Sequence, residues 1–266
     1  MYCRVRTDLL PVPSCARAEP EVPVNSIVFV HGLTGHCYDT WRSKDASDPW
    51  IKTLLPRAVS KARVLTYGYD AGVVGREVSQ GTIRSHARNL IGGLDHFRMK
   101  DCSVGEPSLP CPEGLKSRGT NTSSQSDRPL LFACHSLGGL VVEDAIVFAK
   151  QRPESDQACT AFFRSIRGIM FFGTPHSGTD AHGAVDMFRA MSQMVAQTNK
   201  RLVDVLNKES EVLQNMQDEF LTIIEDLPPE KRISITCFAE EVPTTGIGLV
   251  RPPDPSSFSA PRRSDR

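Results

Sequence analysis

The chain has 266 residues, of which 39% are hydrophobic, so it is long enough to bury a full core as one large domain or two small ones. Lysine plus arginine and aspartate plus glutamate both number 31, so the formal net charge is zero. This balance gives no electrostatic case for nucleic acid or an anionic surface as a partner. We therefore expect no nucleic-acid partner, and binding is expected to depend on a pocket.

The N-terminal segment, residues 1–24, is expected to be irregular. Its apolar stretch is interrupted by Pro11 and Pro13, whereas a signal peptide needs a longer continuous apolar run. Asp8 and the two prolines also interrupt the amphipathic helix that a mitochondrial presequence requires. No apolar run in the chain reaches the roughly 18 residues that span a bilayer. We expect no transmembrane segment, while peripheral contact with a membrane stays open.

The first core strand is predicted at residues 25–30 (NSIVFV), which are rich in β-branched and aromatic side chains. The next residues, His31 to His36 (HGLTGH), form a glycine-bracketed loop. In acyl transfer, backbone N–H groups must already point at the carbonyl oxygen on which negative charge builds. A loop of the H-G-x type supplies one of these groups. The amide of Leu33 is therefore a candidate oxyanion donor.

Three further elements are predicted before the middle of the chain. A helical turn is expected at residues 50–58 and a strand at residues 62–70. A helix is expected at residues 81–100, because apolar side chains recur there every three or four positions. Residues 101–128 are rich in Ser, Gly, Pro and Thr and contain few large apolar residues, so they are predicted to be a disordered insertion.

The most informative segment is residues 129–142 (PLLFACHSLGGLVV), where Ser136 lies between an apolar strand and a helix. This pattern is typical of a nucleophile elbow, a strained turn that projects the serine hydroxyl into a pocket. The usual spelling is G-x-S-x-G, and here Cys134 takes the place of the first glycine. Cysteine is small enough for this to be a mild departure. We expect Ser136 to be the nucleophile and the Leu137 amide to be the second oxyanion donor.

Strands and helices continue to alternate after this serine. A helix is predicted at residues 137–152, a strand at 167–172, an amphipathic helix at 202–227 and a strand at 233–238. The helix at 202–227 either covers the C-terminal edge of the sheet as a cap or packs in the core. This alternation predicts an α/β fold with a mostly parallel central sheet and helices on both faces.

A serine nucleophile needs a histidine to take its proton and an acid to orient that histidine. In this fold class the acid and then the histidine follow the serine along the chain. Glu240 and Glu241, just after the last predicted strand, are both placed for the acid, but no histidine follows them. Residues 251–266 are predicted to be a disordered tail. His176 and His182, after the strand at 167–172, could approach Ser136, but the loop that delivers the base in this fold class usually follows a later strand.

The eight cysteines show no C-x-x-C pairing and no histidine at metal-ligand spacing. We therefore expect free thiols in a reducing, intracellular compartment, no metal site and no cofactor.

Several segments together carry a resemblance to a known family: FVHGLTGHCYDTW, ARVLTYGYDA, HARNL, LLFACHSLGGLVVEDAI and GIMFFGTPHSG. They resemble the lipase-like α/β-hydrolase domain of serine-active-site-containing proteins and of fungal multidomain proteins, from about Ile27 to Val250. The resemblance implies an α/β-hydrolase domain at residues 25–250, with Ser136 as nucleophile, Leu33 and Leu137 at the oxyanion positions and Glu240 as acid. Family members continue into one more strand and a histidine-bearing loop, so the expected fold lacks that C-terminal strand.

Two functions follow from these expectations. The first is a serine hydrolase of the esterase or lipase type that acts on a lipid or another acyl ester. The second is a catalytically dead pseudoenzyme, or a module that recognises a ligand or partner, because the downstream histidine is absent. The family resemblance implies association with mitochondria or the endoplasmic reticulum, and a cytoplasmic location is the alternative. The sequence predicts no oligomeric state.

Overall fold

The computed structural model describes residues 9–11, 25–32, 35–70, 83–103, 128–174 and 214–238. Within these residues the sheet has the strand order β1-β3-β2-β4-β5-β6. The strands are β1 (Leu9–Pro11), β2 (Asn25–Val30), β3 (Ala62–Tyr67), β4 (Leu130–His135), β5 (Ile166–Phe172) and β6 (Ser234–Phe238). Only the pairing of β1 with β3 is antiparallel, and all other neighbours are parallel. The predicted fold class, α/β with a mostly parallel sheet, is confirmed.

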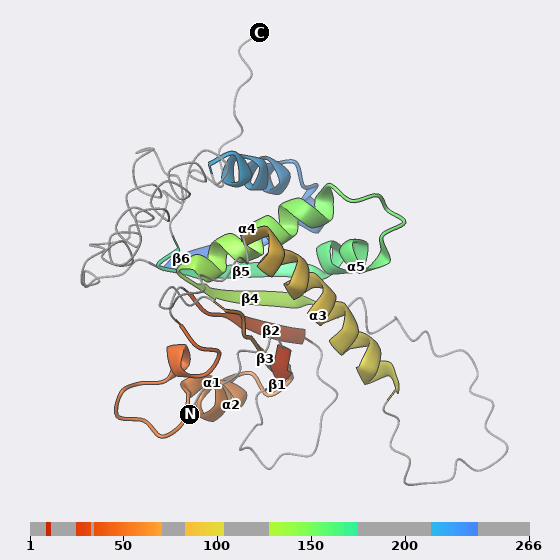
Figure 1. Cartoon of the computed structure of the whole chain (residues 1–266). Helices are drawn as coiled ribbons and strands as arrows, with labels where there is room; N and C mark the ends of the chain where they lie inside the picture. Colours follow the sequence, from red (N-terminus) through yellow and green to blue (C-terminus); the bar gives the residue numbers. More distant parts are fainter. Residues whose placement is uncertain are drawn as a thin grey trace, which may run out of the picture.

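The helices lie between the strands along the chain (Figure 1). They are η1 (Asp39–Trp41), α1 (Trp50–Thr53), α2 (Leu55–Ala58), α3 (Ile83–Ser103), α4 (Leu137–Lys150), α5 (Gln157–Ser165) and η3 (Pro229–Lys231). Residues 214–225 are also helical and belong to the range 202–227 predicted as one helix. No helix in the described part of the chain is both long enough and apolar enough to cross a membrane.

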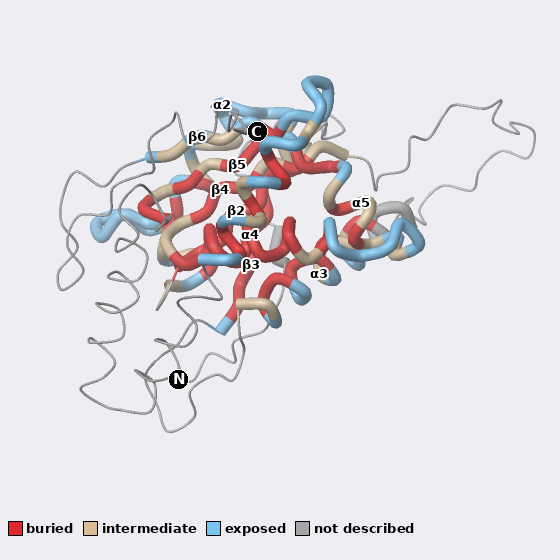
Figure 2. Tube along the Cα trace, turned by 90° about the horizontal axis from the view of Figure 1, so that it is seen from above, coloured by how far each residue is buried: buried red, intermediate tan, exposed pale blue. Residues whose placement is uncertain are grey.

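Helices cover both faces of the sheet, as predicted. Successive side chains of a strand point to opposite faces, and in β2 the pair Val28 and Val30 joins one apolar cluster while Ile27 and Phe29 join another. The larger cluster lies under α3, α4, α5 and the helix at 214–225, and the smaller one lies under η1 and α1. Viewed from above, the buried residues form the centre of the molecule (Figure 2).

Helix α4 is the central helix of the larger cluster, and every residue from Leu137 to Val147 is buried. Two of these residues are carboxylic acids, and each has a partner on a neighbouring helix. The amide nitrogen of Gln217 lies 3.4 Å from Glu143 Oε2, and a nitrogen of Arg84 lies 2.8 Å from Asp144 Oδ1. These contacts join α4 to the helix at 214–225 and to α3, as buried polar groups require.

Some parts of the fold differ from the sequence-based expectation. Residues 9–11, within the segment expected to be irregular, form β1, and Pro11 is tolerated because edge strands leave some N–H positions unpaired. Helix α3 continues to Ser103, into the start of the predicted insertion, and α5 is an additional helix. Residues 104–127 of the predicted insertion and the predicted tail at 251–266 lie outside the described residues.

Candidate active site

The strand order indicates where a ligand would bind. Strand β2 lies between β3 and β4, so the chain first adds a strand on one side of β2 and then adds the next on the other. In open α/β sheets, ligands bind beyond the carboxyl ends of the strands at such a reversal of order. The residues that follow these two carboxyl ends are His31 after β2 and Ser136 after β4.

Ser136 has an unusual backbone conformation, with φ 51° and ψ −124°. Among the described residues it is the only non-glycine with a positive φ. Such a conformation costs about 1–3 kcal/mol and persists only where the surroundings hold it. Here the Ser136 N–H donates to the carbonyl oxygen of Phe172 at 2.9 Å, and its own carbonyl accepts from the Gly139 N–H at 3.0 Å. The serine is partly exposed, so solvent reaches it at the turn between β4 and α4.

The loop after β2 touches this serine. A Cβ atom added at Gly32 would lie 2.7 Å from the Ser136 Cβ and 2.9 Å from the carbonyl oxygen of His135. A Cβ added at Gly138 would lie 2.5 Å from the carbonyl oxygens of both Val30 and His31. All of these distances are shorter than the contacts that real Cβ atoms make. The two glycines therefore allow the end of β2 and the start of α4 to meet around Ser136.

Leu137 is the first residue of α4. The first N–H groups of a helix have no partner within the helix, and they lie at the positive end of its dipole. The Leu137 side chain is buried, so only its amide can serve at this turn. Leu33 and Glu240 lie outside the described residues, as do His176 and His182. The roles expected of these residues stay predictions.

His31 lies beside the serine turn but is held by other contacts. Its Nδ1 lies 2.9 Å from the carbonyl oxygen of Gly32, and its Nε2 accepts from the Tyr69 N–H at 3.3 Å. The Tyr69 hydroxyl donates to the His31 carbonyl at 2.8 Å, and the two rings stack with centroids 4.5 Å apart. Burial lowers the pKa of the imidazole. A neutral His31 with both ring nitrogens engaged supports the loop and is a poor proton acceptor.

The end of β5 contributes two residues of the motif GIMFFGTPHSG to which the sequence analysis gave no role at the site. Gly173 has φ 55°, and its N–H donates to the carbonyl of Phe238 at 3.2 Å. Thr174 follows, and a Cβ added at Gly139 would lie 2.3 Å from atoms of its side chain. Three strand ends therefore meet at the serine turn. The sequence signal for the end of β5 was Gly173, directly after the strand predicted at 167–172, because a glycine there marks a sharp change of direction.

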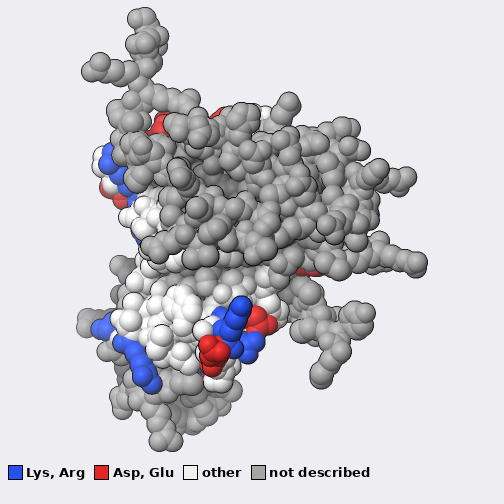
Figure 3. All heavy atoms as spheres, turned by 90° about the vertical axis from the view of Figure 1, so that its left-hand side faces the viewer, with Lys and Arg blue, Asp and Glu red and all other residues white. Residues whose placement is uncertain are grey.

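Figure 3 shows the side of the molecule on which α4 begins. The described atoms on this side are mainly uncharged, and the charged side chains gather in small groups. In the part of the chain that the structure describes, no group of three or more histidine, cysteine, aspartate or glutamate residues is arranged to hold a metal ion.

No family model matches the chain. It is similar to Protein SERAC1 of Bos taurus, with 25% identity over 234 residues that cover 82% of this chain and 30% of that protein. The human and mouse proteins of the same name are each 24% identical to it, over 82% and 87% of this chain. The chain thus spans about a third of the length of these curated relatives. The similarity agrees with the expected resemblance to serine-active-site-containing proteins, while the resemblance to fungal proteins stays an expectation.

Among solved structures, the chain is similar to the Bacillus licheniformis lipase BlEst2, with 14% identity, 87% of this chain and 71% of that chain covered, and a TM-score of 0.45. It is also similar to MGS-MChE2, an alpha/beta hydrolase enzyme from a sediment metagenome, with 12% identity, 86% and 83% coverage and a TM-score of 0.40. At this level of similarity the two structures say nothing about the activity of this chain.

Proposed function

We propose that the chain is a serine hydrolase that cleaves acyl esters, including lipid esters, with Ser136 as nucleophile. The observation that carries this proposal is the backbone of Ser136: a partly exposed serine with φ 51°, held where the ends of β2, β4 and β5 meet. A strained serine at a strand-to-helix turn is the arrangement that presents a hydroxyl to a substrate.

The reaction would run in two steps. The Ser136 hydroxyl loses its proton to a base, its oxygen bonds to the carbonyl carbon, and the alcohol of the ester leaves with a proton. Water then cleaves the acyl-serine bond by the same route and releases the acid. In both steps the amides of Leu137 and Leu33 would hold the negative oxygen. Leu137 begins α4 directly after Ser136, and Leu33 follows Gly32, which lies against Ser136.

The base would be a histidine oriented by Glu240. His31 is excluded by its other contacts. His176 is the first candidate, because it follows Thr174 by two residues and Thr174 lies against Gly139. His182 is the second candidate.

A fluorophosphonate probe tests the nucleophile, because it labels only activated serines. We expect the purified chain to be labelled, Ser136→Ala to lose the label, and Ser43→Ala, at an exposed serine, to keep it. In the same assay His176→Gln is expected to lose labelling, while His96→Gln, at an exposed position on α3, keeps it. Circular dichroism confirms that each variant is folded. A folded wild-type chain without label, or a label that survives in Ser136→Ala, would contradict the proposal.

The second candidate is a recognition module that binds an ester or partner in the same place without turnover. The engagement of both His31 ring nitrogens favours it, because this histidine next to the serine turn serves the loop. In that case the folded chain takes no fluorophosphonate label, and Ser136→Ala binds a non-hydrolysable ester analogue as tightly as wild type. Weaker binding by Ser136→Ala would argue against the module.

A further inference from the structure

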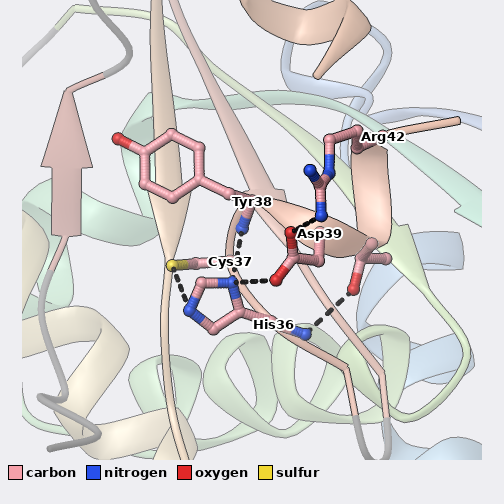
Figure 4. Close-up of polar contacts among 6 residues, drawn as sticks. His36, Cys37, Tyr38, Asp39 and Arg42 are labelled. Atoms are coloured by element: carbon pink, nitrogen blue, oxygen red, sulfur yellow. Dashed lines mark hydrogen bonds and ion pairs between the residues drawn. The ribbon is translucent and has the colours of Figure 1, made fainter. Parts of the chain in front are cut away.

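Three neighbouring residues in the segment after the glycine loop bring together a thiol, an imidazole and a carboxylate (Figure 4). The Cys37 sulfur lies 3.8 Å from His36 Nε2, and His36 Nδ1 lies 3.2 Å from Asp39 Oδ2. The two nitrogens of one ring thus face two different groups. The sequence analysis treated Cys37 only as a free thiol and did not predict this arrangement.

The backbone and one cation hold this group of residues in place. The His36 N–H donates to the Thr40 hydroxyl at 3.1 Å, and the Thr40 N–H donates to the His36 carbonyl at 3.2 Å. The second oxygen of Asp39 lies 2.7 Å from a nitrogen of Arg42. The carboxylate is therefore fixed by Arg42 on one side and presents its other oxygen to His36.

We propose that Cys37 is a modification site for soft electrophiles, with His36 as the acceptor of the thiol proton and Asp39 as the residue that positions His36. His36 Nδ1 lies 3.2 Å from the Asp39 carboxylate and 3.4 Å from the Tyr38 backbone nitrogen. The shorter contact, with a negatively charged oxygen, favours a proton on Nδ1, which leaves Nε2 unprotonated and facing the sulfur. The thiolate formed in this way is the reactive species. Asp39 stabilises the imidazolium that results, although both side chains are about half exposed, so water weakens the interaction.

The chemical class of the reagent is an α,β-unsaturated carbonyl compound. The Cys37 thiolate bonds to the β-carbon, the carbon–carbon π bond breaks, and the resulting enolate takes up the proton that His36 had accepted. Sulfur, carbon and proton are all accounted for, so no oxidant or reductant is needed. The Cys37 residue is 8% exposed, so a small reagent is required.

Cys237 on β6 is the matched control within the same chain. It is more exposed than Cys37. If exposure alone set the rate, Cys237 would react faster, whereas proton transfer to His36 makes Cys37 faster. The two explanations therefore predict opposite orders of reaction.

The experiment treats the whole chain with N-ethylmaleimide and follows each cysteine by peptide mass spectrometry. At pH 7 we expect Cys37 to react at least about tenfold faster than Cys237, because each unit by which a thiol pKa approaches neutral pH gives about tenfold more thiolate. His36→Gln is expected to remove most of this advantage, and Asp39→Asn to lower the Cys37 rate a few-fold. His96→Gln leaves it unchanged.

The pH profile of the wild-type chain is a second measurement that needs no variant. Between pH 8 and pH 6 the Cys37 rate is expected to fall less steeply than the Cys237 rate, because His36 takes up the Cys37 thiol proton. The proposal is wrong if Cys237 reacts as fast as Cys37, if the two pH profiles are parallel, or if a folded His36→Gln chain keeps the full Cys37 rate.

Discussion

The two faces of the sheet are built in different ways. The larger apolar cluster lies under α3, α4 and the helix at 214–225, and α4 also carries the buried acids Glu143 and Asp144. The smaller cluster, under η1 and α1, centres on Phe29, Trp41 and Ile51. The larger cluster fixes α4 and with it the backbone of the serine turn, whereas the smaller one fixes the segment after β2. We call the two clusters, each with the segment that it fixes, the two supports of the site. Gly32 and Gly138 lie where these two segments meet, so the candidate site depends on both supports.

The largest expected effect separates these two supports. Phe132 is fully buried in the larger cluster with its ring 5.9 Å from Phe162, and Phe132→Ala is expected to cost about 3–5 kcal/mol of unfolding free energy. Phe29 packs edge-on against Trp41 and Trp50 at 4.9 Å and 5.6 Å, so Phe29→Ala removes support from the smaller cluster. Chemical denaturation measures both losses.

The rate at which a fluorophosphonate labels Ser136 then shows which cluster supports the serine turn. Trp41 of the smaller cluster also packs against the ring of His135, the residue before the serine. Per folded molecule, Phe29→Ala is expected to label several-fold more slowly than Phe132→Ala. If an alanine variant does not fold, the leucine variant of the same residue replaces it. Equal labelling by the two folded variants would show that the smaller cluster does not support the site.

The next effect concerns the contact between the two supports. Gly138→Ala places a methyl group 2.5 Å from the carbonyl oxygens of Val30 and His31. Both oxygens belong to the backbone and cannot rotate away, so we expect Gly138→Ala to lower the unfolding free energy by about 1–3 kcal/mol. Labelling of Ser136 is also expected to fall, because α4 must shift away from β2. A stable Gly138→Ala chain with normal labelling would mean that the close approach is not required.

A smaller effect, confined to the larger cluster, depends on pH. Burial raises the pKa of the Asp144 carboxyl from its ordinary value of 3.8 to about 6. The positive charge of Arg84 lowers this pKa, but by less than burial raises it. The folded state therefore binds this proton more tightly than the unfolded state. The resulting stability is present below about pH 4 and is lost as the pH rises through 6. Between pH 4 and pH 7 we expect the unfolding free energy of wild type to fall by about 1–3 kcal/mol relative to that of Asp144→Asn.

Urea denaturation of both chains at several pH values measures this difference. Glu154→Gln, at an exposed acid, is the control and should follow wild type at every pH. Parallel pH curves for wild type and Asp144→Asn would show that this carboxyl titrates as it does in the unfolded chain.

The core strands were predictable because each is a short apolar run between turn residues. The strained strand-to-helix turn at Ser136 was predictable from the motif that spans β4 and α4. Strand β1 was missed because three residues that include a proline give no period, so its pairing with β3 depends on tertiary contacts. Helix α5 was missed because its buried apolar side chains are only Cys159 and Phe162. Its N-terminus relies on the Asp156 carboxylate, which accepts from the Cys159 N–H at 3.1 Å.

The arrangement around the serine was predictable only in part. The motifs indicated that the loop after β2 should approach Ser136, and Gly32 lies against it. The sequence did not indicate that His31 is engaged through both ring nitrogens or that Thr174 joins the turn, because these contacts link strands that are far apart in the chain. The roles of Leu33 and Glu240 stay predictions.

The smallest effect gives the matched control for Gly138 and has the opposite sign. Gly92 lies in α3 with no heavy atom within 4 Å of the position that a Cβ would occupy. Alanine there reduces the freedom of the unfolded chain without a clash, so Gly92→Ala is expected to stabilise the protein by about 0.5–1 kcal/mol. The same methyl group thus stabilises a helix that covers the larger cluster and destabilises the junction of the two supports. Thermal denaturation measures the stability of both variants. If Gly92→Ala is destabilised as much as Gly138→Ala, the loss at Gly138 does not come from the close contact between α4 and β2.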